Sequence, residues 1–286
     1  METHTLGVDG ADLVYDVRPG PSEHRPLLMI GQPMSAEGFT ALAGHFTDRT
    51  VITYDPRGLG RSKRTDGRKD NTPQRQAADL HRLLEVLGHG PVDVFASSGG
   101  AVTALELVTT HPADVATLVA HEPPLSTVLP DAEAADRARA GFNEAYESKG
   151  WGAGMAAFIA MTSWSGEFTE DYFAQPAPDP AAFGMPAEDD GNRGDPLLSR
   201  NSWAVTDYRL DVAALRAAPT RIVLAVGEET GDTYTARTAR ATAAALGQEA
   251  VVFPSHHGGF LGGEFGYAGQ PEAFAARLHE VLDSQA

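Results

Sequence analysis

A serine between small residues, Ser98, is the residue of this sequence best placed to act as a nucleophile. It stands in residues 96–100, Ala-Ser-Ser-Gly-Gly, after the apolar run 92–95 and before the helix-like run 101–107. A turn that passes so sharply from strand to helix strains the serine backbone, exposes its hydroxyl and leaves room only for small neighbours. The alternative is a Ser/Gly-rich turn without chemistry, and a lone Ser-x-Gly does not separate the two.

Backbone N–H groups near Ser98 could stabilise the negative charge that develops on a carbonyl oxygen under attack. The N–H of Gly99 begins the helix that follows the serine, where the helix dipole favours an anion. A second donor is predicted in residues 31–35, Gly-Gln-Pro-Met-Ser. We assign it to Gln32, because Pro33 has no N–H. These two donors would form an oxyanion hole.

Two adjacent histidines compete for the role of general base. His256 and His257 follow the apolar run 251–253. An imidazole at that position could take the serine proton and return it to a leaving group. The alternative is that both histidines are solvent-facing loop residues.

Carboxylates that could orient the imidazole follow two other strand-like runs. Glu122 comes after residues 117–120. Three more acids come after residues 222–226: Glu228, Glu229 and Asp232. The alternative for Glu122 is an acid that stabilises the start of a following helix, which is worth about 0.3–1 kcal/mol.

The wider pattern of the sequence predicts an α/β fold that would bring these side chains together. Short apolar runs, interpreted as buried strands, alternate with amphipathic stretches. The strand-like runs are residues 27–30, 51–54, 92–95, 117–120, 222–226 and 251–253. Between them, residues 74–87 carry apolar side chains on one helical face, and Gly88 marks the end of this helix. Such alternation is typical of a mostly parallel sheet covered by helices.

The alternation stops in residues 125–216, which contain no strong strand signal. Helical patches there are separated by Pro- and Gly-rich segments such as residues 175–180, Gln-Pro-Ala-Pro-Asp-Pro. We interpret this region as a helical cap over the sheet, with a loop near residues 175–196. The α/β core would then comprise residues 1–124 and 217–286.

These motifs together resemble the α/β-hydrolase family. Residues 31–35 are similar to its oxyanion loop, and residues 54–62, Tyr-Asp-Pro-Arg-Gly-Leu-Gly-Arg-Ser, to the turn after the next strand. The Ser98 elbow and a C-terminal histidine complete the order. Ile30 and Ala96 replace a histidine and a glycine of the family's motifs, and neither change removes a catalytic atom. The resemblance implies a mostly parallel eight-stranded sheet flanked by helices, with a helical cap inserted after strand 6.

The resemblance also implies roles for the histidine and the acid. The family's Pro-x-x-His loop selects His257 as the base and leaves His256 as the fallback. Its usual acid register, after the next-to-last strand, falls on Thr230, which has no charge to steady an imidazolium. Residues 121–124, His-Glu-Pro-Pro, are similar to those of the fungal zearalenone lactonases, whose acid is this glutamate. We therefore favour Glu122 as the acid, with two alternatives in the later loop: Asp232 and Glu229.

Several large apolar side chains are candidates to line the substrate pocket. Trp203 lies in residues 202–209, which weakly resemble a cap segment of the same lactonases in which a tryptophan lines the pocket. Ordinary packing within the cap is the alternative for a tryptophan at this position. The other candidates are Met34, Trp164 and Phe260. Trp151, Phe158 and Met161 could line the same cavity, although their near-helical spacing fits a buried cap face equally well.

Composition and charge exclude several classes of function. The formal net charge of −17 over 286 residues disfavours nucleic acids and anionic membranes as partners. The sequence has no cysteine and no apolar run long enough to span a bilayer. Its first residues lack the pattern of a signal peptide, so the expected location is the cytoplasm. No dinucleotide fingerprint, phosphate loop or metal-ligand spacing is present, and we expect no cofactor and no metal.

The combined sequence features predict a serine hydrolase that cleaves a carboxylic ester or lactone through an acyl-enzyme. A small, moderately apolar ester or lactone is the expected substrate. Two alternatives remain open: a ligand-binding or receptor-like protein that keeps the fold without efficient catalysis, and a cofactor-free perhydrolase. The oligomeric state is not predicted.

Overall fold

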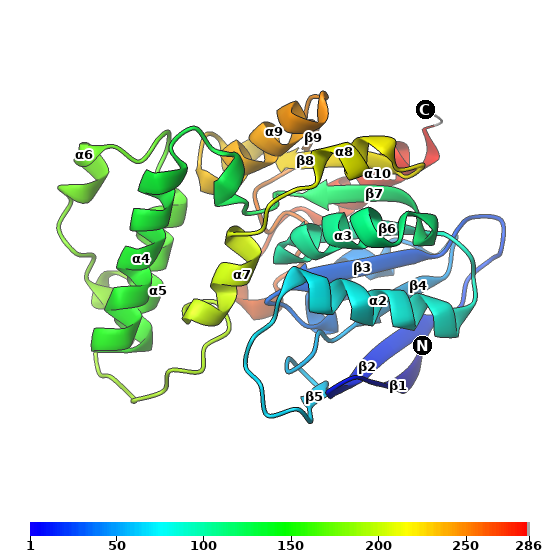
Figure 1. Ribbon diagram of the computed structural model, residues 1–286, viewed down its shortest axis with the longest axis horizontal. Helices are drawn as coiled ribbons and strands as arrows, with labels where there is room; N and C mark the ends of the chain where they lie inside the picture. The colour runs from blue at the N-terminus through cyan, green and yellow to red at the C-terminus, as the bar shows by residue number, and fades with distance from the viewer. Residues whose placement is uncertain (285–286) are drawn as a thin grey trace.

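A central twisted sheet organises the chain, which is described here by a computed structural model over residues 1–284 (Figure 1). Eight strands follow the order β1-β2-β4-β3-β6-β7-β8-β9, and the two-residue strand β5 pairs with β2. Their bounds are β1 (Glu2–Val8), β2 (Ala11–Arg18), β3 (Leu27–Gln32), β4 (Val51–Tyr54), β5 (Lys63–Arg64), β6 (Val92–Ser98), β7 (Val115–His121), β8 (Arg221–Gly227) and β9 (Val251–Phe253). The pairs of β2 with β1, β4 and β5 are antiparallel, and the pairs that connect β4 to β9 are parallel. The predicted fold is therefore confirmed, with β5 as an addition.

Helices cover both faces of the sheet. They are α1 (Thr40–Gly44), α2 (Pro73–Leu87), α3 (Gly99–Thr110), α8 (Val212–Ala217), α9 (Tyr234–Leu246) and α10 (Pro271–Asp283). Helix α2 begins with a Thr72 cap followed by proline and ends at Gly88, whose φ of 64° suits glycine. Apolar side chains of α2, α3 and α8 pack on one face of the sheet. Those of α1 and α10 pack on the other.

A helical unit lies beside the sheet between β7 and α8, at the left of Figure 1. It contains α4 (Ala132–Lys149), α5 (Trp151–Ser163), α6 (Glu170–Phe173) and α7 (Trp203–Thr206). Helices α4 and α5 approach closely at Gly154. A side chain there would meet the Tyr146 backbone at 2.9 Å, so only glycine permits this approach. Its apolar cluster comprises residues between 129 and 198 together with Tyr234. The last part of residues 125–216, the segment predicted as cap, packs on the sheet: Val205, Tyr208 and Leu215 belong to the core cluster of the sheet.

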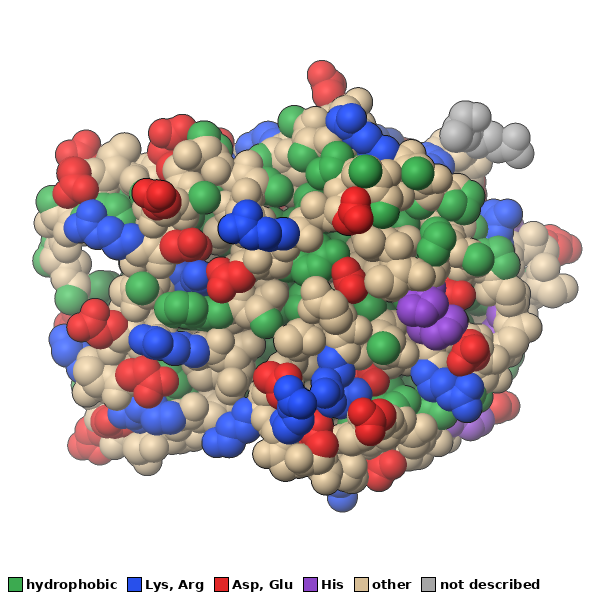
Figure 2. All heavy atoms as spheres, viewed as in Figure 1, with side chains coloured by type: hydrophobic (Ala, Val, Ile, Leu, Met, Phe, Trp, Pro, Cys, Tyr) green, Lys and Arg blue, Asp and Glu red, His purple; other side chains and the backbone are tan. Residues whose placement is uncertain are grey.

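Short 3-10 turns complete the described structure. They are Ala36–Phe39, Pro112–Asp114, Ser126–Val128, Pro180–Phe183, Arg200–Ser202, Glu228–Thr230 and Glu264–Gly266. The Pro-rich loop predicted near residues 175–196 contains only one of them. Acidic and basic side chains are interspersed on the face shown in Figure 2. None of the helices within residues 1–284 is long and apolar enough to cross a bilayer.

Candidate active site

The strand-to-helix turn at Ser98 has the geometry predicted for a nucleophile elbow. Ser98 ends β6 and has a φ of 55°, a backbone conformation that non-glycine residues rarely adopt. Gly99 then begins α3. A side chain at Gly100 would meet the Gly31 Cα at 2.7 Å and the Ile30 carbonyl oxygen at 2.8 Å. The sequence therefore needs glycine at position 100 for α3 to approach β3 this closely.

A buried carboxylate lies at the end of the neighbouring strand, β7. Glu122 is fully buried, and its φ of 47° turns the chain away from the sheet. Its Oε2 lies 2.5 Å from Nδ1 of His257 and accepts a hydrogen bond from the Thr235 hydroxyl at 2.8 Å. Its Oε1 accepts a hydrogen bond from the Gly227 N–H at 2.8 Å. Both oxygens are thus satisfied, as a buried carboxylate requires.

The surroundings of Glu122 favour its ionised form. Burial by itself raises the pKa of this carboxyl, but the hydrogen bond from His257 and nearby positive charge outweigh burial. The net result is a pKa below the ordinary glutamate value. An ionised Glu122 holds His257 with its proton on Nδ1, which leaves Nε2 to accept a proton from a nucleophile.

Ser98 and His257 line the same cavity, although their side chains belong to different loops. The hydrogen bonds within residues 1–284 do not include one between the Ser98 hydroxyl and His257. Catalytic hydrogen bonds of this kind often tighten only when substrate is bound. The arrangement brings together the three side chains that the sequence predicted for a triad.

The alternative base and acids have other partners. His256 accepts the Gly258 N–H through Nδ1 at 3.0 Å, and its Nε2 lies 3.3 Å from the Ala268 carbonyl oxygen. Glu229 accepts a hydrogen bond from Gln270, and the exposed Asp232 lies 3.7 Å from Arg240. Neither acid contacts His257 among the described residues. The structure therefore pairs Glu122, and not these acids, with the imidazole.

The predicted oxyanion loop lies beside the nucleophile. Gln32, the last residue of β3, pairs in register with Ser98 on β6. The loop is braced by Asp55, which accepts hydrogen bonds from the N–H groups of Ala36 and Arg61, each at 2.8 Å. The second family-like motif, residues 54–62, thus holds the oxyanion loop in place.

The cavity above Ser98 has a volume of about 650 Å³ and lies between the sheet and the helical unit. Apolar side chains contributed by α4, α5 and the following loop line much of it: Phe142, Phe158, Ile159, Met161 and Leu197. Gln32 and Gly99 lie on its core side with the serine. Arg139 is a buried exception, and its guanidinium is paired with Asp136 and Asp207. The site can accommodate a small, largely apolar molecule.

Of the predicted pocket residues, Phe158 and Met161 line the cavity, whereas Trp151 and four others do not. Phe260 is buried in the core cluster with Phe39, and Met34 packs beside it. Trp164 packs against Tyr172 and donates its indole N–H to the Glu167 carbonyl oxygen. Trp203 stacks under the Arg139 guanidinium at 4.3 Å. None of the four is among the described residues that line the cavity. Their types indicated burial, but no sequence signal separated pocket walls from packed interior.

One buried residue next to the acid was not singled out by the sequence. His121 is fully buried, and its ring stacks on that of His257 with centroids 5.9 Å apart. Its Nδ1 lies 3.3 Å from the hydroxyl of Ser97, the neighbour of the nucleophile. Burial lowers the pKa of His121 to about 4, which keeps the ring neutral near pH 7. Its position within residues 121–124 was the available signal.

Comparison with known proteins agrees with this geometry. The model of the alpha/beta hydrolase family matches residues 27–277, and the chain belongs to that family. An uncharacterized hydrolase of Bacillus subtilis, YraK, is 29% identical over 298 residues, which cover 98% of this chain and 96% of the relative.

Solved structures show the same fold at low sequence identity. A hydrolase from Pseudomonas aeruginosa is 20% identical with a TM-score of 0.64, and the alignment covers 99% of this chain and 98% of that one. A thermophilic esterase from Thermogutta terrifontis is 19% identical with a TM-score of 0.64 and the same coverage. The chain is therefore a hydrolase by family, and its fold is shared with an esterase.

Proposed function

We propose that this protein hydrolyses a carboxylic ester or lactone through Ser98, His257 and Glu122. The observation that carries the proposal is the 2.5 Å contact between the buried Glu122 carboxylate and His257, beside the cavity that also holds the strained Ser98 turn. An acid, an imidazole and a serine in this arrangement are the parts of a nucleophilic triad. The esterase among the structural neighbours supports the same reaction class.

In the proposed reaction the serine oxygen attacks the carbonyl carbon while His257 Nε2 takes its proton. The N–H groups of Gln32 and Gly99 stabilise the negative oxygen of the tetrahedral intermediate. Its collapse breaks the bond to the leaving alkoxide, which receives the proton from His257 and leaves an acyl-serine. Water then attacks the acyl carbon by the same sequence and frees the acid. For a lactone, the alcohol and the acid belong to one product molecule.

The cavity supports a compact, moderately apolar substrate. Its 650 Å³ falls within the range of small-molecule sites, and α4 and α5 supply its apolar walls. The sequence resemblance of residues 121–124 to the zearalenone lactonases favours a macrocyclic lactone as the substrate class. An apolar wall selects by shape and size, whereas the triad supplies the reaction.

A fluorophosphonate probe tests the triad directly, because it forms a covalent bond only with an activated serine. We expect labelling of the wild-type protein at Ser98 and none in Ser98→Ala. Ser148→Ala is the matched control, since Ser148 is an exposed residue of α4. Hydrolysis of an ester and lactone panel, zearalenone included, should fall by several orders of magnitude in Ser98→Ala only.

Three results would contradict the proposal. Absence of labelling in the folded wild-type protein would favour a binding or receptor-like role. Hydrolysis that is undiminished in Ser98→Ala would place the chemistry elsewhere. Peroxide-dependent halogenation without ester hydrolysis would instead favour a perhydrolase.

A further inference from the structure

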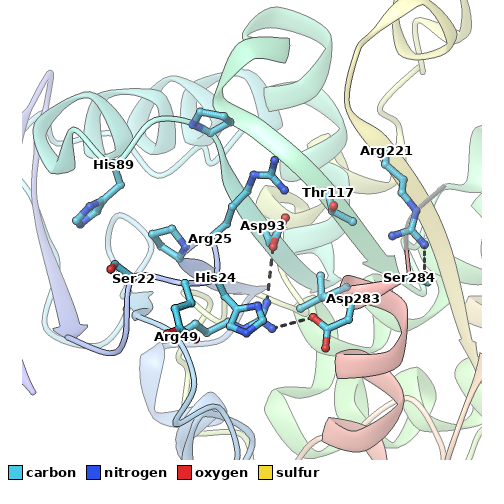
Figure 3. A pocket seen from close by; sticks show the side chains of 14 residues that line it. Ser22, His24, Arg25, Arg49, His89, Asp93, Thr117, Arg221, Asp283 and Ser284 are labelled. Carbon is cyan, nitrogen blue, oxygen red and sulfur yellow. Dashed lines mark hydrogen bonds and ion pairs between the residues drawn. The ribbon is translucent and has the colours of Figure 1, made fainter.

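A second cavity lies at the ends of the central strands opposite to Ser98 (Figure 3). Its volume is about 970 Å³, larger than that of the catalytic cavity. It is formed at the amino ends of β3, β6, β7 and β8, together with the end of α10. The proposed triad lies at the carboxyl ends of the same strands, so the proposed hydrolytic reaction does not use this second cavity.

Three polar residues form a row across the floor of this cavity. Asp93 on β6 pairs in register with Thr117 on β7, and Thr117 pairs in register with Arg221 on β8. Asp93 and Thr117 are 5% and 6% exposed. The central strands of a parallel sheet are normally apolar on both faces, because helices cover them. The two buried polar residues of this row, Asp93 and Thr117, therefore require an explanation.

Some charged residues of the cavity have structural roles in ion pairs or hydrogen bonds. The guanidinium of Arg49 is buried and lies 3.0 Å from Asp48 and 3.1 Å from Asp283. It thereby ties the end of α10 to the loop before β4. Arg221 donates to the Val281 carbonyl oxygen and to the Ser284 hydroxyl, and it has no carboxylate partner in the part of the chain that the structure describes.

Two charged groups in the cavity keep unmet hydrogen-bonding atoms. Asp93 Oδ2 lies 3.7 Å from the Arg49 guanidinium, but Asp93 Oδ1 is buried and has no hydrogen-bond partner. Arg25 forms neither an ion pair nor a side-chain hydrogen bond with any other residue in 1–284. Figure 3 shows Arg25 and Arg221 on either side of Thr117, with Asp93 beside Arg25. An acceptor and two guanidinium groups without carboxylate partners thus face one space.

Burial and charge act against each other at Asp93. Burial raises its pKa, and the Thr117 hydroxyl and the charges of Arg25 and Arg49 oppose that rise. A buried carboxyl oxygen without a donor is unfavourable unless a donor is supplied from outside the protein. The guanidinium groups have the opposite need, since their planar donors match carboxylate or phosphate oxygens.

We propose that this cavity binds a small organic anion that also carries a hydroxyl or ammonium group, as a hydroxy acid does. The anionic oxygens accept hydrogen bonds from Arg25 and Arg221, and the hydroxyl or ammonium group donates to Asp93 Oδ1. The exposed Glu23 also lines the cavity and disfavours ligands of higher negative charge. This site is independent of the proposed hydrolase reaction.

The test compares L-malate with succinate, which lacks the hydroxyl group, by isothermal titration calorimetry on the full chain. We expect saturable binding of L-malate that is about tenfold tighter than that of succinate. Arg25→Gln should weaken malate binding about tenfold, whereas Arg209→Gln, which changes another exposed arginine, should leave it unchanged. Asp93→Ala should abolish the preference for malate over succinate.

The same titration on protein whose Ser98 has been blocked by the fluorophosphonate, or on Ser98→Ala, separates the two cavities. Binding should persist in both forms. No saturable malate binding by the wild type up to about 10 mM would overturn the proposal. Loss of binding when Ser98 is blocked, or unchanged binding in Arg25→Gln, would overturn it as well. The exposed position of Arg25 makes a folding defect of that variant unexpected.

Discussion

The buried imidazole of His121 should make the protein less stable as the pH falls from 7 to 5. Its pKa in the folded state is about 4, against 6.5 for an unperturbed histidine. Between about pH 6.5 and pH 4 the unfolded chain therefore binds a proton at this imidazole that the folded state does not bind. The free energy of unfolding is unaffected by this group above about pH 6.5 and decreases as the pH falls toward 4. At pH 5 the difference between the two proton-binding equilibria amounts to about 2 kcal/mol.

The choice of pH 5 separates His121 from its neighbour Glu122. The pKa of Glu122 is lowered in the folded state, so its contribution to stability is present above the unfolded glutamate value and is lost only at more acidic pH. Urea unfolding of the wild type at pH 7 and pH 5 gives the total loss of free energy. In His121→Phe, whose new ring meets the neighbouring Phe274 and Phe260, this loss should be smaller by about 2 kcal/mol.

A control variant tests whether the effect depends on burial. His4→Phe removes an imidazole that is 43% exposed, and it should leave the pH-dependent loss of the wild type unchanged. If His121→Phe retains the whole loss between pH 7 and pH 5, then His121 is not the group that titrates and the reasoning from burial is refuted. The unfolding slope in urea should be the same for all three proteins, which confirms that the free energies are comparable.

Three further predictions concern Glu122, its hydrogen-bond partner Thr235 and the buried ion pair between Arg57 and Asp79. Glu122→Gln should lower kcat/KM about 10⁴-fold by removing the charge that orients the imidazole, whereas Asp232→Asn should change it little; the reverse order in a kinetic assay would move the acid to the later loop. Thr235→Val removes a hydrogen bond to the Glu122 carboxylate and should reduce kcat about tenfold, with KM nearly unchanged. Asp79→Ala removes the bidentate partner of the buried Arg57, leaving it only the more distant Asp66 carboxylate and a backbone carbonyl, and should cost about 3–5 kcal/mol in urea unfolding; a loss below 1 kcal/mol would contradict this.

Local signals were sufficient to predict the strand-to-helix turn at Ser98. Ser98 and its small neighbours define a turn within a few residues, and the turn formed as expected. The position of α2 was also predicted to within one residue, because its apolar face and the Gly88 stop are both local signals. Strands β1 and β2 were missed, since β1 is largely exposed and lacks the apolar run used to find the others.

The contacts that complete the site are not local. Glu122 and His257 are separated by 135 positions, and only the order of the strands brings the ends of β7 and β9 within reach of each other. The pocket walls were harder to predict, because an apolar residue on a cap helix has the same sequence pattern whether it faces the cavity or the packed interior. Phe158 and Trp164 illustrate this: the first lines the cavity, and the second packs against Tyr172.

The proposed acid, Glu122, follows one strand and accepts a hydrogen bond from the end of the next. The usual acid register after β8 holds Thr230, and the chain at that point instead donates the Gly227 N–H to Glu122. Gly227 has no space for a side chain, because a Cβ there would lie 2.5 Å from the Thr230 hydroxyl and 2.7 Å from the Ser255 carbonyl oxygen. The end of β8 therefore supplies a hydrogen bond to the charge that β7 carries. Glu122, which follows β7 with a positive φ, thus contacts the imidazole from the neighbouring strand, and the end of β8 contributes a hydrogen bond in place of a carboxylate.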